Sequence, residues 1–317
     1  MRRIDPMVRL LLLAIVLATV LPVGGRWAGF AQFVSNAAVF LLFFLNGLRL
    51  PRREVIAGIG KWRLLVPLTA FVYIAMPAAG WLLWQSTGQV LPPLLALGFL
   101  FLGTLPSTVQ SATAYTSLAG GNVASSVVAA ALLNILGVFV TAPLFALLAG
   151  SSAAPFDGAG LLKVMTILLL PFALGQALQR RLGGWVTGHR QLVVWMDRTS
   201  IAIAVYVAFS SAVRQGIWAR IEPAGWAGIL GGCAALLVFG YGGSWLVSRL
   251  IGLDRGDRIA MMFAGAQKSI AMGAPLATVL FPPAAAGVIL LPTLAYHLAQ
   301  LVVAAPLASR LKANVPT

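Results

Sequence analysis

The segment GAQKSIAMG, residues Gly265–Gly273, contains Lys268, the only charged residue within the long apolar stretches of this chain. An ammonium near the centre of a bilayer costs about 2.5–3.5 kcal/mol on insertion scales, so it is kept where it has a partner or a wet cavity. No Asp or Glu lies in the interior of an expected span to pair with it. Lys268 is therefore the first candidate for a functional site.

Composition places the chain in the membrane. Of its 317 residues, 60% are hydrophobic and only 9% are charged, with a mean hydropathy of +0.94. Soluble domains carry roughly 25% charged residues. The net charge of +15 is spread over short loops between apolar runs, which favours the lipid bilayer as partner and argues against nucleic acid. The single Cys233 excludes an internal disulfide and a thiolate metal cluster, and we expect no metal site.

The apolar runs are long enough for ten transmembrane helices, since each needs about 17–25 residues. The first run follows Arg residues as in a secretory signal but lacks a cleavage site of the A-x-A type, so we expect it to be retained. With a cytoplasmic N-terminus, 17 Lys and Arg residues fall at inner ends and 4 at outer ends, Lys268 being the last of the 22. This asymmetry predicts that both termini are cytoplasmic. The expected spans are about 9–24, 30–50, 63–84, 93–117, 122–149, 160–179, 198–214, 225–250, 257–281 and 284–309.

Two parts of the chain resemble each other. Ser111 and Ser269 match at an offset of 158 residues, and Ala142-Pro143-Leu144 matches Ala305-Pro306-Leu307 at an offset of 163. Five spans per copy is an odd number, so the second copy must enter the membrane from the opposite side. The sequence therefore predicts a single integral membrane transporter domain over 1–317, built from inverted repeats of about 1–150 and 155–317.

The fourth and ninth spans are unusually polar and carry Pro or Gly, which interrupts helices. We expect them to unwind near Pro106–Ser111 and Gly265–Ser269 and to cross there, as interrupted helices do at transporter sites. Close packing of helices through small residues is the other interpretation of this composition. The candidate substrate-binding residues on these spans are Lys268, Gln110, Ser111, Thr113 and Ser269.

Lys268 should be satisfied by Gln110, Ser111 and Thr113 and by carbonyls freed at the breaks. His297 and Gln300 are three residues apart on one face of the last span and could turn toward the same place, His297 either as a proton relay or in a helix–helix hydrogen bond. His297 and, in the second span, Asn46 are further candidate substrate-binding residues, with helix packing as the alternative for Asn46.

In four stretches the chain resembles the bile acid:sodium symporter superfamily. The stretches are LPSTVQSATAYTSLAGGNVA (Leu105–Ala124), GAQKSIAMGAPLATVLFP (Gly265–Pro282), LLFFLNGLRL (Leu41–Leu50) and YHLAQL (Tyr296–Leu301). The chain is most similar to the bacterial SBF-like branch, which is also similar to the solute carrier family 10 member 7 type. The resemblance implies an all-α fold in which a panel domain packs against a core domain that contains the crossing helices.

The resemblance also identifies departures at the ion sites. Phe263 stands where sodium-coupled members have a carboxylate, Ala112 and Thr113 replace a Ser-Asn pair, and Ala130 replaces a Thr. The resemblance further implies that the symporters have an Asn, beside the substrate, at the position of Lys268. The ammonium of Lys268 could therefore replace the charge of a sodium ion, hold a substrate carboxylate or titrate. No cofactor is expected except a possible sodium ion. The ion ligands that would remain are Gln267, Ser126, Thr113 and Gln300.

The leading hypothesis is a secondary-active transporter of a small organic anion that works by alternating access in the bacterial inner membrane, coupled to sodium or protons. Alternatives are an ion-independent facilitator and a non-transporting membrane regulator that keeps the symporter fold. An open cavity beside Lys268 would favour transport, and a crossing filled by Phe263 and Tyr115 would favour the regulator. No catalytic motif is present, so we expect no enzyme. Oligomeric state and substrate identity do not follow from the sequence.

Overall fold

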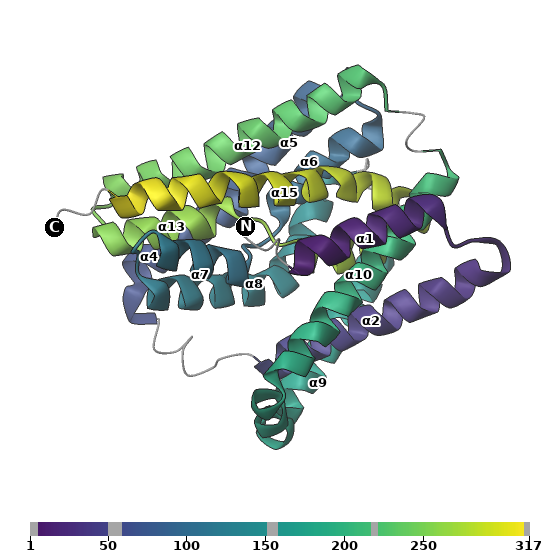
Figure 1. Cartoon of the computed structure of the whole chain (residues 1–317), viewed down its shortest axis with the longest axis horizontal. Coiled ribbons are helices and arrows are strands. Elements are labelled where there is room, and N and C mark those ends of the chain that lie inside the picture. Colours follow the sequence, from purple (N-terminus) through teal and green to yellow (C-terminus); the bar gives the residue numbers. More distant parts are fainter. Residues whose placement is uncertain (1–5, 50–58, 151–157, 217–220, 314–317) are drawn as a thin grey trace. The chain divides into compact units, whose positions relative to one another are not determined.

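The computed structural model describes residues 6–49, 59–150, 158–216 and 221–313, and every regular element in these ranges is helical (Figure 1). The elements are α1 (Pro6–Val20), η1 (Gly25–Trp27), α2 (Ala28–Arg49), η2 (Ile59–Lys61), α4 (Trp62–Ala70), η3 (Phe71–Ala75), α5 (Met76–Thr87), α6 (Pro93–Thr104), α7 (Val109–Leu118), α8 (Val123–Ala149), α9 (Gly158–Gly188), α10 (Arg190–Arg214), α12 (Pro223–Leu250), α13 (Arg255–Ala266), α14 (Ile270–Leu280) and α15 (Pro283–Ala313). The expected all-α class is confirmed.

Several of these helices can cross a membrane. By length and composition six continuous helical stretches qualify, and α6 with α7 makes a seventh if this pair, bent by 62°, counts as one span. The six stretches are Gly25–Arg49, Trp62–Thr87, Val123–Ala149, Arg190–Arg214, Pro223–Leu250 and Pro283–Lys312. The chain is thus a multi-pass membrane protein, whereas ten crossings remain a prediction.

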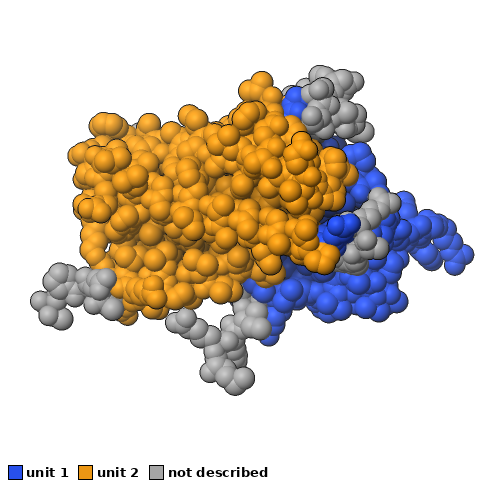
Figure 2. All heavy atoms as spheres, turned by 90° about the horizontal axis from the view of Figure 1, so that it is seen from above, with its two compact units in different colours: residues 1–50, 149–222, 273–290 blue, residues 51–148, 223–272, 291–317 orange. Residues whose placement is uncertain are grey.

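The chain divides into two compact units (Figure 2). Unit 1 comprises residues 1–50, 149–222 and 273–290, and unit 2 comprises 51–148, 223–272 and 291–317. Unit 1 therefore holds α1, α2, α9 and α10, while α4 to α8, α12 and α13 belong to unit 2. Helices α14 and α15 contribute residues to both.

In unit 1, α2 packs against both α9 and α10, and α1 packs against α10. The contact of α2 with α9 is close because two glycines face each other. A Cβ on Gly47 would lie 2.2 Å from the carbonyl oxygen of Phe172, and a Cβ on Gly175 would lie 2.2 Å from that of Phe44. Only hydrogen at these two positions lets the helices approach this far.

In unit 2, α5 and α6 approach in the same way. A Cβ on Gly103 would lie 2.8 Å from the carbonyl oxygen of Met76, and a Cβ on Gly80 would lie 2.6 Å from that of Phe99. The contact fixes the last turn of α6, whose carbonyls form part of the site described below. A separate apolar cluster joins α4, α8 and α13 through buried residues that include Leu68, Leu133 and Met261.

The polar stretch 179–199, which the expected spans 160–179 and 198–214 leave as a connection, is not a loop. It is helical almost throughout, because α9 continues to Gly188 and α10 begins at Arg190 (Figure 1). The stretch contains no Pro, and its Arg, Leu and Gln residues favour helix, so the spans extend beyond their apolar parts. Several of the Lys and Arg residues that were assigned to inner or outer ends of spans lie outside the described residues. They are Arg2, Arg3, Arg52, Arg53 and Arg220, and the side chain of Lys163 is not described either.

Candidate functional site

Two helix breaks in unit 2 touch each other. The chain is non-helical at 105–108, between α6 and α7, and at 267–269, between α13 and α14. The N–H of Ser269 donates to the carbonyl oxygen of Pro106, with an N–O distance of 2.9 Å. Pro106 explains the first break, since the residue before a proline avoids helical geometry, and Leu105 has φ −69° and ψ 146°.

The first break is shorter than expected. Helix α7 resumes at Val109, so Gln110, Ser111 and Thr113 lie in regular helix and not in the unwound segment. Only Leu105–Thr108 is extended, because a single proline disrupts the turn around it and the following residues can form helix again.

Lys268 crosses from the second break to the end of α6. Its side chain is 1% exposed, and its Nζ donates to the carbonyl oxygens of Gly103 at 2.9 Å and Leu105 at 2.7 Å. The last carbonyls of a helix lack intrahelical donors and carry the negative end of the helix dipole. The amino group of Lys268 thus lies where backbone oxygens at a helix end favour a positive charge.

The expectation that span-four side chains would satisfy Lys268 is wrong, because the freed carbonyls do so. The hydroxyl of Ser111 donates instead to the Oε1 of Gln267. Gln110 lies exposed on α7. The carbonyl oxygens at the end of α6 bind the Nζ of Lys268 in place of these side chains, because the helix end lies next to the second break.

Gln300 holds the backbone of Lys268. Its Oε1 accepts from the N–H of Lys268 at 2.8 Å, and its Nε2 donates to the carbonyl oxygen of Lys268 at 3.1 Å. The Nε2 also lies 2.9 Å from the Nδ1 of His297. His297 and Gln300 therefore share one face of α15, and Gln300 reaches the second break. Nearby, the hydroxyl of Tyr296 donates to the carbonyl oxygen of Ala266 at 2.6 Å.

A line of hydroxyls runs beside the breaks. The Oγ of Ser126 lies 3.5 Å from the Oγ1 of Thr113 and 3.3 Å from that of Thr116. Gln267, which receives the hydroxyl of Ser111, donates from its Nε2 to the hydroxyl of Tyr241 at 3.5 Å. Of the candidate ion ligands, Ser126 and Thr113 thus contact each other, whereas Gln267 contacts Ser111 and Tyr241 and Gln300 contacts Lys268.

The side chains of two other candidates make local contacts. Ser269 is buried, and its Oγ accepts from the N–H of Met272 at 3.3 Å, which caps the start of α14. Asn46 belongs to unit 1, where its Oδ1 accepts from Arg49 at 3.1 Å. Substrate contact for either residue stays a prediction.

Phe263 is the centre of an aromatic cluster. It is fully buried, stacks on Tyr115 with ring centroids 5.9 Å apart, and meets Tyr241 edge-on at 6.0 Å. Tyr115 is held in turn by a hydrogen bond to the carbonyl oxygen of Leu301 at 3.1 Å. Where the family resemblance implies a carboxylate, three aromatic rings pack together and supply no anionic ligand.

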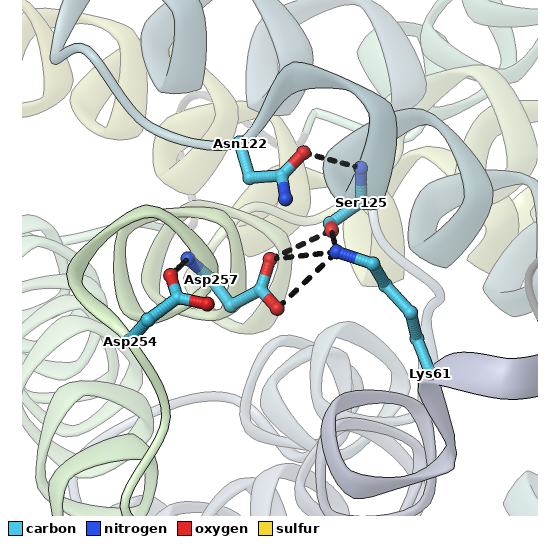
Figure 3. A network of polar contacts seen from close by, with 5 residues as sticks. All are labelled: Lys61, Asn122, Ser125, Asp254 and Asp257. Carbon is cyan, nitrogen blue, oxygen red and sulfur yellow. Dashed lines mark hydrogen bonds and ion pairs between the residues drawn. The ribbon is translucent and has the colours of Figure 1, made fainter.

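A polar network that sequence reasoning missed joins the end of η2 to the starts of α8 and α13 in unit 2 (Figure 3). The Nζ of Lys61 lies 3.3 Å from both carboxylate oxygens of Asp257 and 2.6 Å from the Oγ of Ser125. Ser125 also donates to Asp257 at 2.7 Å. Asp254 caps α13 by accepting from the N–H of Asp257, and Asn122 accepts from the N–H of Ser125.

A sequence signal for this network exists. Two of only seven acidic residues occur at Asp254 and Asp257, in the spacing of a helix N-cap and its third residue. The charge asymmetry that predicts topology considers Lys and Arg alone, so it assigns these two carboxylates no role. Together they tie η2, α8 and α13 at one end of unit 2.

A chain with several membrane-capable helices and a buried lysine at paired helix breaks belongs to the class of polytopic membrane proteins with a buried polar site. The model of the SBF-like CPA transporter family matches residues 5–313. The chain therefore belongs to the SBF-like CPA transporter family, and the expected relation to bile acid:sodium symporters is confirmed. It is a transporter-family protein and not an enzyme.

Relatives cover nearly the whole chain. "Uncharacterized protein PA2026" of Pseudomonas aeruginosa is 38% identical over 95% of this chain and 90% of its own length. "Putative symporter YfeH" of Escherichia coli is 37% identical over 98% of this chain and 94% of its own length. "Sodium/bile acid cotransporter 7" of Mus musculus is 26% identical over 88% and 83%.

Proposed function

We propose that this protein is a secondary-active transporter of small organic anions in the bacterial inner membrane, in which the ammonium of Lys268 takes the place of a bound coupling cation. Ten membrane crossings in two inverted repeats, with both termini cytoplasmic, complete the proposal. The names of the relatives supply the substrate class, since one is named as a symporter and another as a sodium/bile acid cotransporter.

The observation that supports this most directly is the buried Nζ of Lys268, bound to the carbonyl oxygens of Gly103 and Leu105. Carbonyl oxygens at a broken helix are ligands for Na⁺ in secondary transporters. Here a covalently attached charge meets them. Phe263 meanwhile removes the carboxylate that a sodium ion would need in the neighbouring polar region.

Such a carrier needs no sodium at the break. Because the side chain of Lys268 is covalently attached, no cation has to bind or leave at this place during the cycle, and a proton gradient would supply the driving force. Gln267 and Ser126 offer neutral oxygens alone, which bind a hard cation weakly.

The test is uptake by proteoliposomes of an organic anion chosen by thermal stabilisation of the purified protein. We expect the same uptake with sodium and with choline, and no uptake by Lys268→Ala. The exposed Lys312→Ala at the end of α15 serves as the matched control and should transport normally. Steep sodium dependence of the unaltered protein, or normal uptake by Lys268→Ala, would contradict the proposal.

A second candidate, a non-transporting membrane regulator, is favoured by one observation. Tyr115 and Phe263 stack beside the breaks and fill space that a ligand would need. For a regulator we expect that no organic anion raises the melting temperature of the unaltered protein or of Phe263→Ala. Stabilisation of the unaltered protein by any organic anion decides for transport.

A further inference from the structure

Unit 1 contains an apolar groove between α2 and α10. Its volume is about 490 Å³, and its lining includes Val34, Ala37, Leu41, Trp195, Met196 and Ile203. The lining on α10 extends from Leu192 to Ile203, which corresponds to about 16 Å of helix. This is roughly half of the hydrocarbon thickness of a bilayer, the depth that one leaflet's acyl chain occupies.

Two arginines of α10 lie along this groove, Arg190 before the lining begins at Leu192 and Arg198 within the range of the lining. Arg190 begins α10 and is exposed, and Arg198 lies with its guanidinium carbon 5.6 Å from the ring centre of Trp195. The Nε of Arg198 is buried and has no hydrogen-bond partner among the described residues. Trp195 is itself part of the groove lining, so a charged group and an apolar surface meet at one side chain.

Acidic groups do not cancel this charge. Within the described residues of unit 1, Asp197 and Glu222 are the acidic side chains, and Asp197 forms an ion pair with Arg49. Arg49 is held further by Asn46, at 3.1 Å. Arg190 and Arg198 therefore keep an excess of positive charge, to which Arg180 and Arg181 add at the exposed end of α9.

We propose that the groove between α2 and α10 binds an anionic phospholipid, with an acyl chain along the groove and the headgroup phosphate at Arg198 and Arg190. Arginine forms bidentate hydrogen bonds with phosphate, and the Nε of Arg198 is a donor in need of an acceptor. Anionic lipids are attracted to basic clusters at the ends of spans. A free anion would use the arginines but not the apolar groove. The site does not depend on the transport function proposed above.

Tryptophan quenching by brominated lipid tests this, because Trp195 lines the groove. The protein is placed in phosphatidylcholine nanodiscs that contain a minor fraction of dibrominated phosphatidylglycerol or dibrominated phosphatidylcholine. The contribution of Trp195 is the difference in quenching between the unaltered protein and Trp195→Phe. We expect the brominated phosphatidylglycerol to be preferred about fivefold for each arginine engaged.

Three variants make the test specific. Arg198→Gln and the exposed Arg190→Gln should each reduce the preference for phosphatidylglycerol about fivefold. Ala37→Phe adds bulk at an exposed groove position and should lower quenching of Trp195 by both brominated lipids. Arg26→Gln is the matched control, since Arg26 lies over Trp27 at 5.4 Å in the same type of contact, and it should change nothing.

Equal quenching of Trp195 by both brominated lipids would overturn the proposal. Competition by millimolar inorganic phosphate, with no quenching of Trp195 by brominated chains, would assign the arginines to a free anion and overturn it as well. An equal effect of Arg26→Gln and Arg198→Gln would show a general surface charge effect and no site. Size-exclusion profiles of all variants must match the unaltered protein for the comparison to count.

Discussion

The ammonium nitrogen of Lys268 lies 2.7 Å from the main-chain oxygen of Leu105, the residue immediately before Pro106. The proline that ends α6 therefore exposes an acceptor, and the second helix break supplies its donor. A charge that would be costly in lipid is balanced here by the end of a helix and not by a carboxylate.

Lys268→Ala should abolish stabilisation by organic anions while the protein stays folded. The variant leaves two carbonyls without their donor but also removes a buried charge, so the two effects on folding oppose each other. Lys268→Arg should retain part of the ligand response, because it keeps the charge, but its larger guanidinium must fit a site that is 1% exposed. Melting temperatures with and without ligand measure both. Unfolding of Lys268→Ala in the absence of ligand would show that the lysine is structural.

Sodium should stabilise the unaltered protein weakly, with a Hill coefficient of no more than one. Phe263, Ala112 and Ala130 offer no oxygen where the family resemblance implies ligands, and Gln267 already accepts from Ser111. Thermal stabilisation titrated with sodium chloride against choline chloride checks this. Lys268→Ala should gain a sodium response, since the carbonyls of Gly103 and Leu105 then lack their cation. Steep two-ion behaviour of the unaltered protein speaks against the prediction.

Gln300→Leu should destabilise the protein by roughly 2–4 kcal/mol, because the N–H and the carbonyl of Lys268 would both lose their partner in a buried place. Gln300→Glu keeps the acceptor and should cost less. Gln32→Leu, which removes an exposed contact with Asn36, is the control and should be close to neutral. Denaturant unfolding in detergent ranks the three. Equal stability of Gln300→Leu and Gln32→Leu would refute the role assigned to Gln300.

Gly103→Ala should destabilise the protein by about 1–3 kcal/mol through overpacking, since its Cβ would lie 2.8 Å from the carbonyl oxygen of Met76. Gly231→Ala in α12 meets nothing within 4 Å and should stabilise by about 0.5–1 kcal/mol through helix propensity. Thermal unfolding compares the pair. If both substitutions shift the melting temperature in the same direction, the close contact of α5 with α6 does not constrain the fold.

Asp257→Ala should cost more stability than Lys61→Ala. The carboxylate of Asp257 accepts from both Lys61 and Ser125, and its side chain is 12% exposed, whereas that of Lys61 is 43% exposed. Loss of the acid strands two donors, while loss of the partly solvated lysine leaves Ser125 in place. Melting temperatures at low and high salt measure the difference. A larger cost for Lys61→Ala would show that the exposed amine carries the network.

The sequence predicted the helical class, the family and the positions of the two breaks, because Pro106 and the Gly265–Gly273 segment are local signals. It also placed His297 and Gln300 on one helix face, and Gln300 contacts the second break. Of the partners expected for Lys268, the freed carbonyls are confirmed, whereas the side chains of Gln110, Ser111 and Thr113 are not its partners. The sequence shows which polar side chains are present, but the distance from Lys268 to each of them depends on how the helices pack.

Other features depended on tertiary structure for the same reason. Residues 179–199 are polar enough to be taken as a connection, and their helical state follows from propensity and from the absence of Pro. The Lys61–Asp257 pair joins residues 196 positions apart, and nothing local links them. The groove of unit 1 needs two helices whose side chains leave space between them, which composition cannot specify.

The way Gln300 binds residue 268 makes the side chain at that position exchangeable. Both main-chain groups there are satisfied by Gln300, so the break can persist whatever residue the position carries. Charge at the centre of the protein can thus be changed by one codon while the surrounding backbone keeps its partners. For protein engineering this separates scaffold from chemistry, and a series of neutral, basic and amide residues at position 268 would give carriers that share one architecture and differ in what drives them.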